Sequence, residues 1–374
     1  MTLLVATVAV LVTGCRGDPA IRATATPTDD GGGPTAPTEG RTEPAPGSAT
    51  PAAGGSSACQ VTETGGSSDL AFNASAYRGL RVAERDLGLE VTALEPGEDG
   101  HGTAISTLLE QRCDVIVTVG DAAGEATRSA AEANPDQPFV AVDVRYDPPI
   151  DNVLALTFAT DEPAFLADYL AAGMSDSGVV ATLGGADIPA VTTFMDGFAA
   201  GVGHWNRTQG AQVELLGWDL ADPTAASFVG ALDDEEGARA LTDQLLERGA
   251  DIVMPVTGAG IVGAAEAVRE WGHAAKLIWV DSDGCTTAEE YCDLILTSVL
   301  QHADIAVAAA IADAVGGAFD GGTYVGTLEN DGVGLAPFHE LAGEVPEELA
   351  AAIEELSASI TDGTIAVEPS PDGS

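Results

Sequence analysis

The stretch QVTETGGSSDLAFNASAYRGL, residues 60–80, has the pattern of a strand that passes through a glycine turn into a helix. Gly65 and Gly66 allow a turn at low steric cost, and the Ser-Ser-Asp that follows contains residue types that favour a helix N-cap. Apolar residues then recur at helical spacing and predict one buried face: Phe72, Ala76, Leu80, Ala83 and Leu87.

In a parallel α/β sheet, such a turn lies at the carboxyl end of its strand, where ligands bind in a crevice. Four side chains in or beside this turn are therefore expected to face a ligand: Glu63, Asp69, Phe72 and Asn73.

The same order of strand, turn and helix recurs along the chain. Strands are predicted at 89–94, 114–119, 139–142 and 152–158, and helices at 103–111 and 122–133. After a helix at 162–175 the pattern restarts, with strands at 177–183, 212–216, 251–256 and 276–280 and helices at 190–204, 235–248 and up to 271. This alternation predicts parallel sheets with helices on both faces, in two halves of one architecture.

Two domains are expected, because about 310 residues remain once the tails are removed, too many for one compact core. We place 58–160 and 298–320 in an N-terminal lobe, and 161–297 and 321–368 in a C-terminal lobe. In this interpretation the strand at 294–300 and the helix at 303–317 return to the first half, and the last helix, 346–361, returns to the second.

The chain is strongly acidic, with 59 acidic and 14 basic residues and a formal charge of −45. Such a charge argues against binding of nucleic acid or anionic lipid through the folded body. A solvated, salt-adapted surface is the preferred explanation, and an acidic patch that attracts cations is the alternative.

The N-terminus has the features of an export signal. Residues 3–12, LLVATVAVLV, are too short to span a bilayer but suit a signal-peptide core. The next residues end in Gly14-Cys15, similar to a bacterial lipobox, so we predict a lipoprotein signal peptide at 1–15 and lipidation of Cys15. A stray or buried cysteine is the alternative, and the missing basic n-region leaves the true translation start open.

Residues 16–57 are rich in Pro, Gly, Thr, Ala and Ser and have no apolar period. Such a segment cannot bury enough surface to offset its ordering entropy, so we predict a disordered linker. Together with the lipid, it would hold a folded body at the extracytoplasmic face of the cell membrane.

Export makes disulfides possible, and four cysteines other than Cys15 allow three connectivities. We predict Cys285–Cys292, which closes a short loop, and Cys59–Cys113, because these two residues precede strands expected to be neighbours. Free buried thiols are the alternative.

One motif is typical of dinucleotide-binding sites. Residues 258–263, GAGIVG, match G-x-G-x-x-G after a strand, and Asp281 follows at a suitable distance. The fingerprint belongs to the first unit of its domain, however, and this turn lies late in the second half of a chain with 45 glycines. A glycine turn beside a crevice is the preferred interpretation, and an exported NAD-dependent oxidoreductase is kept as an alternative.

Signals of catalysis are otherwise missing from the sequence. The five histidines show no metal-ligand spacing, and no nucleophile elbow, P-loop or HExxH helix occurs. We therefore predict no enzyme, no cofactor and no metal. Carboxylates instead recur where predicted strands end: Glu63, Asp121, Asp143, Asp187, Asp219 and Asp281. Acceptor groups on the rims of two lobes suggest a protein that closes on a small molecule.

The motif at 61–73, VTETGGSSDLAFN, resembles the T-D-x-G-G-x-x-D-x-S-F-N of the basic membrane protein family of ABC-transporter substrate-binding lipoproteins, which includes purine nucleoside receptors. Further similar stretches are GGADIP at 184–189, GADIV at 249–253, VDSD at 280–283, LTSV at 296–299 and NDGVGL at 330–335. The resemblance runs from about Cys59 to Val367. It implies a type I periplasmic-binding fold, in which a hinge joins two doubly wound parallel-sheet α/β lobes.

The resemblance also implies roles for individual residues. Phe72 would stack on a purine face, and Glu63 and Asn73 would hydrogen-bond the edge of the base. Asp143 and Asp281 would accept ribose hydroxyl groups, with Gly258 on the cleft wall.

Three positions depart from the family pattern. Glu63 replaces an aspartate, Leu232 replaces a second aromatic residue, and Gln301 replaces a lysine near the sugar. Trp218 or Phe228, in an insertion, would supply the missing aromatic ring, or Leu232 would cover the base itself.

The function predicted is that of an anchored substrate-binding protein that closes on a nucleoside-like ligand and delivers it to ABC permease and ATPase subunits. We expect a monomer that contacts the membrane only through its lipid and binds no nucleic acid. A ligand sensor for a membrane regulator is the alternative, and the identity of the ligand stays open.

Overall fold

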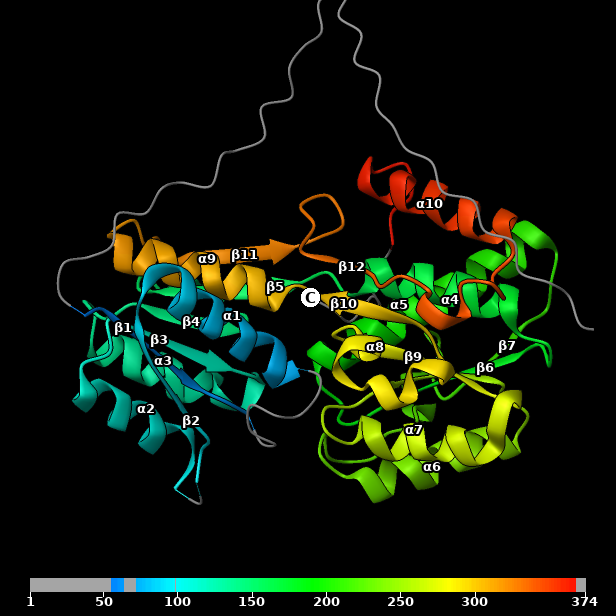
Figure 1. The fold of residues 1–374 in the computed structure, drawn as a ribbon, viewed down its shortest axis with the longest axis horizontal. Helices are drawn as coiled ribbons and strands as arrows, with labels where there is room; N and C mark the ends of the chain where they lie inside the picture. The colour runs from blue at the N-terminus through cyan, green and yellow to red at the C-terminus, as the bar shows by residue number, and fades with distance from the viewer. Residues whose placement is uncertain (1–54, 64–71, 98, 368–374) are drawn as a thin grey trace, which may run out of the picture. The chain divides into compact units, whose positions relative to one another are not determined.

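Two six-stranded sheets organise the computed structural model, which describes residues 55–63, 72–97 and 99–367 (Figure 1). All of these residues belong to one compact unit, Ser48–Ser374. The other unit, Met1–Gly47, lies outside the described residues, and so do the predicted signal peptide, Cys15 and Asp69.

The first sheet is entirely parallel and has the strand order β11-β5-β4-β3-β1-β2. Its strands are β1 (Ser57–Val61), β2 (Glu90–Leu94), β3 (Val115–Val119), β4 (Phe139–Val142), β5 (Val153–Phe158) and β11 (Gly322–Gly326). Every residue of β3 and β4 is buried, which explains why these strands are continuous apolar runs: helices cover both of their faces.

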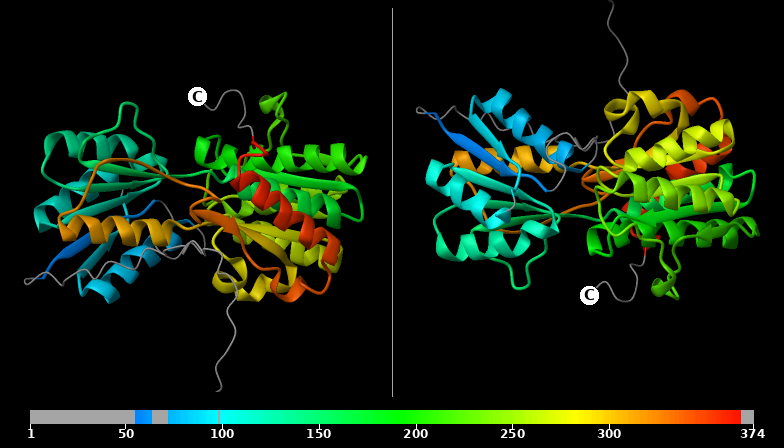
Figure 2. Two further views of the ribbon diagram at one scale, coloured as in Figure 1. Left: turned by 90° about the horizontal axis from the view of Figure 1, so that it is seen from above. Right: turned by 90° about the horizontal axis from the view of Figure 1, so that it is seen from below.

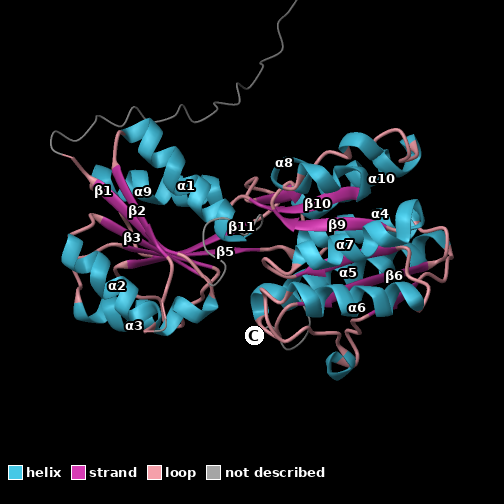
Figure 3. Ribbon diagram, turned by 60° about the horizontal axis from the view of Figure 1, so that its bottom comes forward, coloured by secondary structure: helices cyan, strands magenta, loops and turns pink. Residues whose placement is uncertain are grey.

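The helices of the first sheet form two layers. One apolar cluster joins the sheet to α1 (Phe72–Leu87) and α9 (Ala303–Gly316). The opposite cluster joins it to α2 (Gly100–Gln111) and α3 (Gly124–Ala133). Figure 3 shows the strands of each sheet between helices.

The second sheet has the order β12-β10-β9-β8-β6-β7, in which only β12 runs antiparallel to its neighbour. Its strands are β6 (Val179–Gly184), β7 (Glu214–Leu216), β8 (Ile252–Val256), β9 (Lys276–Asp281), β10 (Ile295–Gln301) and β12 (Val333–Leu335). Its helices are α4 (Asp161–Met174), α5 (Pro189–Gln209), α6 (Glu235–Glu247), α7 (Ile261–Trp271), the short α8 (Gly284–Thr287) and α10 (Glu347–Thr361). In Figure 1, α4 and α5 lie above this sheet and α6 and α7 below it.

The structure corrects part of the predicted return of the chain: α9 packs on the first sheet and α10 on the second as predicted, but two strands differ. The predicted strand at 294–300 is β10, which pairs with β9 and so belongs to the second sheet. β11 lies beyond the predicted boundary at 320, yet it pairs with β5 in the first sheet. A local pattern identifies a strand but does not identify its partner, because pairing depends on contacts distant in sequence.

The chain consequently crosses between the sheets three times. The crossings lie between β5 and α4, between β10 and α9, and between β11 and β12. The connecting segments can be followed in Figure 2. Three connections of this kind are the hinge that a two-lobed binding protein needs.

Both predicted disulfides are present. Cys59 in β1 is joined to Cys113, just before the neighbouring β3, with the Cα atoms 5.9 Å apart. Cys285 is joined to Cys292 in the second half, with the Cα atoms 4.5 Å apart. No helix among the described residues is long and apolar enough to cross a membrane.

Candidate functional site

A pocket opens where the carboxyl ends of strands from both sheets meet. From the first sheet it is lined by Glu63, Asn73, Gly120, Asp121 and Asp143, and from the second by Ile188, Ala190, Val191, Phe194, Leu232, Val256, Thr257, Gly258 and Asp281. This is the position at which open α/β sheets bind ligands. Six of the residues predicted from the sequence are brought together here: Glu63, Asn73, Asp143, Leu232, Gly258 and Asp281.

The first corner of the pocket is built by the turn after β1. The backbone N–H of Glu63 donates to Oδ1 of Asn73 at 2.8 Å, and this bond ties the strand end to the start of α1. Gly120 has φ +88°, and a Cβ placed there would lie 2.5 Å from the Glu63 carboxyl carbon. Its backbone conformation favours glycine, and the absence of a side chain leaves space that the Glu63 carboxylate fills.

The second corner is a carboxylate held from the opposite sheet. Asp143 follows β4, and Nε2 of Gln301, at the end of β10, lies 2.8 Å from each of its carboxylate oxygens. Burial raises the pKa of Asp143 to about 7, although the hydrogen bond from Gln301 acts to lower it. Gln301 is not among the residues that line the pocket, and it contacts the pocket through Asp143.

Most of the second-sheet wall is apolar, and a loop carries Leu232 into it. Backbone N–H groups of Val229 and Gly230 donate to the carbonyls of Gly184 and Gly185 at 2.9 and 2.8 Å, as in an added strand. A Cβ on Gly185 would lie 2.8 Å from a methyl carbon of Leu232, so the loop packs directly on the glycine backbone.

The glycines of the G-x-G-x-x-G motif have structural roles in this wall. Gly258 lines the pocket, and the N–H of Gly260 donates to the Leu232 carbonyl at 3.0 Å. A Cβ on Gly263 would overlap the carbonyl of Glu235, so this residue lets α7 approach the start of α6. Close packing thus accounts for Gly263, and Gly258 and Gly260 both lie against the backbone of Leu232.

The structure places the two candidate replacement aromatics outside the pocket lining. Phe228 packs beneath Gly184, where a Cβ would lie 2.5 Å from its ring, and contacts Trp218 edge to face with ring centroids 6.1 Å apart. Trp218 is 6% exposed, and its Nε1 donates to Oδ1 of Asp196 at 2.9 Å. Phe228 is predicted from the sequence to bind the ligand, but it is half-buried, packs against the second-sheet core and does not line the pocket.

Phe194 is the aromatic residue that the prediction missed. It lies on α5 and lines the pocket beside Val191. A signal existed in the sequence, since a helix that starts soon after a strand-end glycine pair points its first turns at the crevice. Phe72 begins α1, but its side chain lies outside the described part of the structure.

Two polar groups interrupt the apolar wall. Asp281 ends β9 with φ +66°, a conformation rare for residues other than glycine. Thr257 is 2% exposed, and its hydroxyl has no hydrogen-bond partner in the structure. Because buried hydroxyl groups are nearly always paired, the Thr257 hydroxyl is positioned to bond a ligand.

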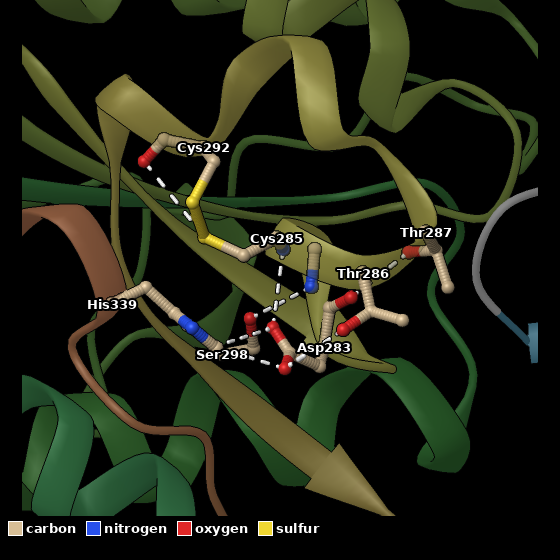
Figure 4. The surroundings of a disulfide bond; sticks show 8 residues. Asp283, Cys285, Thr286, Thr287, Cys292, Ser298 and His339 are labelled. Carbon is tan, nitrogen blue, oxygen red and sulfur yellow. Dashed lines mark hydrogen bonds and ion pairs between the residues drawn. A yellow bond between two sulfur atoms is a disulfide. The ribbon is translucent and has the colours of Figure 1, made fainter.

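The turn after Asp281 is fastened at several points (Figure 4). Asp283 caps α8 by accepting from the Cys285 N–H at 3.1 Å, and its carboxylate pairs with Nε2 of His339 at 2.9 Å. Ser298 accepts from the Gly284 N–H at 3.1 Å, and the Cys285–Cys292 disulfide closes the loop. These contacts hold the end of β9 in place.

Asp283, Cys285 and His339 offer possible metal-ligand atoms within 4.8 Å of one another. The sulfur of Cys285 is committed to the disulfide, and the carboxylate of Asp283 already pairs with His339. The cluster is accounted for by these structural bonds.

Comparison with known proteins identifies the family. A family model described as ABC transporter substrate-binding protein PnrA-like, Bmp, matches residues 57–368. The chain belongs to this Bmp family. The recognition made from the sequence is thus confirmed.

Relatives of this Bmp-family chain include Basic membrane protein A of Borreliella burgdorferi, which is 28% identical over 232 residues, 62% of this chain and 64% of that protein. An uncharacterized lipoprotein of Pyrococcus abyssi is 28% identical over 281 residues, 73% of this chain and 67% of that protein. The match thus spans less than two thirds of the first of these relatives.

A solved ABC transporter solute-binding protein from Aeropyrum pernix is 27% identical, with a TM-score of 0.73 over 85% of this chain and 94% of that one. This similarity confirms the predicted two-sheet, type I periplasmic-binding fold. The family is one of substrate-binding proteins of ABC transporters.

Proposed function

We propose that this Bmp-family chain captures a nucleoside-like ligand, in the first place a purine nucleoside, between its two sheets. It delivers the ligand to ABC permease and ATPase subunits at the extracytoplasmic face of a membrane, where lipidated Cys15 anchors it. The observation that carries the proposal is the pocket, with acceptor groups on one side and an apolar wall on the other.

This division matches the chemistry of a nucleoside. A purine has a flat apolar face and polar edges, and ribose carries hydroxyl groups that donate hydrogen bonds. In the proposal Glu63 and Asn73 bind the edge of the base, and Asp143 and Asp281 accept from ribose. Leu232 covers one face of the base.

Aromatic residues complete the proposed contacts. Phe194 extends the apolar wall, and Phe72 stacks on the base at about 1–3 kcal/mol. The hydroxyl of Thr257 bonds a polar atom of the ligand, which would satisfy its hydrogen-bonding capacity.

Calorimetry and thermal unfolding test the ligand. Adenosine, guanosine and inosine should each raise the melting temperature, with stabilisation of about 2.7 kcal/mol at a ligand concentration of one hundred times Kd. Ribose alone and adenine alone should bind more weakly, because each engages half of the pocket. If none of the three nucleosides binds, the proposed ligand class is wrong.

A pair of variants tests the site. Asp281→Asn should weaken binding, whereas Asp219→Asn should not, because Asp219 follows β7 outside the pocket lining. Equal loss in both variants would contradict the assignment of the pocket.

The anchor has its own test. Full-length protein expressed in a bacterial host should fractionate with membranes and carry an acyl mass on Cys15, and Cys15→Ala should release it. Release of both forms would remove the anchor from the proposal and leave the ligand unaffected.

A further inference from the structure

Gln301 and Asp143 form a contact across the two sheets at the edge of the pocket. Asp143 ends a strand of the first sheet, and Gln301 ends β10 of the second, immediately before the crossing to α9. Nε2 of Gln301 lies 2.8 Å from both carboxylate oxygens. Gln301 is 3% exposed, and its amide nitrogen donates to Asp143, while its own Oε1 has no hydrogen-bond partner in the structure.

The charged side chains that line the pocket beside this pair are all of one sign. Among the described residues that line the pocket, the titratable side chains are Glu63, Asp121, Asp143 and Asp281, and none is basic. His302, the neighbour of Gln301, lines a separate hollow beside α10. An amide can orient a carboxylate but supplies no positive charge to keep it ionised.

The ionisation of Asp143 therefore depends on a neutral partner. Desolvation raises its pKa to about 7, so that both protonation states are populated near neutral pH. The ionised state only accepts hydrogen bonds, and it accepts them more strongly than a protonated carboxyl group, so it is the better partner for the amide of Gln301 and a ligand hydroxyl together.

We propose that Gln301 is a positioning residue that presents Asp143 as the acceptor for a ligand hydroxyl group, and that this arrangement makes ligand affinity rise with pH across the neutral range. The inference rests on the proposed function, since the hydroxyl belongs to the nucleoside-like ligand. It adds that ligand binding releases a proton from Asp143.

The direction of this pH dependence follows from the hydrogen bond between the ligand hydroxyl and Asp143. A ligand hydroxyl that donates to the carboxylate favours the ionised form, so the bound state holds fewer protons than the free state. About one tenth of Asp143 is ionised at about pH 6 and about nine tenths at about pH 8, if its pKa is about 7. Adenosine should then bind about tenfold more weakly at the lower pH.

Substitutions of Gln301 test separately how the ionisation of Asp143 and the position of its carboxylate affect ligand binding. Gln301→Lys keeps a donor and adds an ammonium group, which holds Asp143 ionised and should abolish the pH dependence between about pH 6 and about pH 8. Gln301→Leu removes the donors and should move the midpoint of the pH profile upward. Gln244→Lys, at an exposed position on α6, adds the same charge away from the pocket and should keep the wild-type profile.

Calorimetry of adenosine binding to the full chain, across this pH range and in two buffers of different ionisation heat, measures affinity and proton release together. Carbon NMR of the aspartate carboxyl groups follows Asp143 in the ligand-free protein. Tenfold weaker binding at the lower pH, with proton release that Gln301→Lys removes, would support the inference.

The failures are distinguishable. Adenosine that binds equally well at both pH values, or a pH profile that Gln301→Lys leaves unchanged, would overturn this inference alone. No binding of any nucleoside at any pH would overturn the proposed function and this inference with it, whatever carboxyl titration the NMR experiment shows.

Discussion

The two sides of the pocket differ in chemistry although they come from the same architecture. The first-sheet side contributes three carboxylates and an amide, from Glu63, Asn73, Asp121 and Asp143. The second-sheet side is mainly aliphatic and aromatic, and its polar side chains are Thr257 and Asp281. Both sides use the carboxyl ends of parallel strands, so the fold supplies the position and the local sequence supplies the chemistry.

The difference shows how one site can combine affinity with orientation. Burial of any flat apolar surface against the apolar wall contributes favourable free energy of binding. Carboxylates at fixed strand ends instead select ligands whose hydrogen-bond donors lie in matching positions. A ligand that satisfies both sides must be flat on one face and rich in donors elsewhere.

The largest expected difference between the halves concerns their disulfides. Cys59–Cys113 joins residues 54 apart, and Cys285–Cys292 joins residues 7 apart. Chain entropy predicts a loss of about 4 kcal/mol in free energy of unfolding for Cys59→Ser with Cys113→Ser, and about 2.5 kcal/mol for the second pair of serines. Urea unfolding measures both, and a larger loss for the shorter loop would contradict the prediction.

The acidic contribution to binding is next in size. Asp281→Asn keeps the shape but removes a charged acceptor, and a hydrogen bond to a charged group is worth about 2 kcal/mol, or about thirtyfold in Kd. Calorimetry with adenosine measures the loss. Unchanged affinity would mean that the polar group in the second wall does not bind the ligand.

The apolar wall should respond more weakly. Leu232→Ala removes contact with one face of the ligand and should cost about 1 kcal/mol, or about fivefold in affinity. Leu220→Ala is the matched control, because Leu220 packs on the second-sheet core without lining the pocket. If Leu232→Ala binds as tightly as its control, the wall does not cover the ligand.

The last expected difference concerns Asp143, whose ionisation affects both the stability of the protein and its affinity for the ligand. The folded-state pKa of Asp143, about 7, lies above the unfolded value, so its contribution favours folding at lower pH and is lost as pH rises through about 7. Asp143→Asn cannot ionise and should therefore stabilise the ligand-free protein more at about pH 8 than at about pH 5.

Urea unfolding at the two pH values measures this effect of Asp143→Asn. Equal stability of variant and wild type at the higher pH would show that the ionised Asp143 carries no desolvation cost. The same variant should also bind adenosine more weakly, so stability and affinity are expected to change in opposite directions.

Local pattern was a good guide to the elements and to part of the site. The helical spacing after residue 72 predicted α1, and carboxylates after apolar runs predicted Glu63, Asp143 and Asp281 at the pocket. This worked because parallel strands end at a common edge, so a residue's place in its own strand decides whether it faces the crevice.

The same local reasoning failed for Phe228. An aromatic residue in an insertion fits a pocket wall or a core equally well by composition. In the structure Phe228 forms a β-bridge with Gly184 and packs beside Trp218, and these contacts place it against the core.

By itself, then, the sequence determined the two-sheet α/β class, the cysteine pairs and the positions of Glu63, Asp121, Asp143 and Asp281 at strand ends beside the pocket, but it also predicted Asp187 and Asp219, which do not line the pocket. Only the tertiary structure decided that β10 joins the second sheet, that β11 joins the first and that Phe194 lines the pocket. It also decided that Gln301 meets Asp143 across 158 residues of chain. Contacts of this kind follow from how whole sheets and helices pack, which no local run of residues encodes.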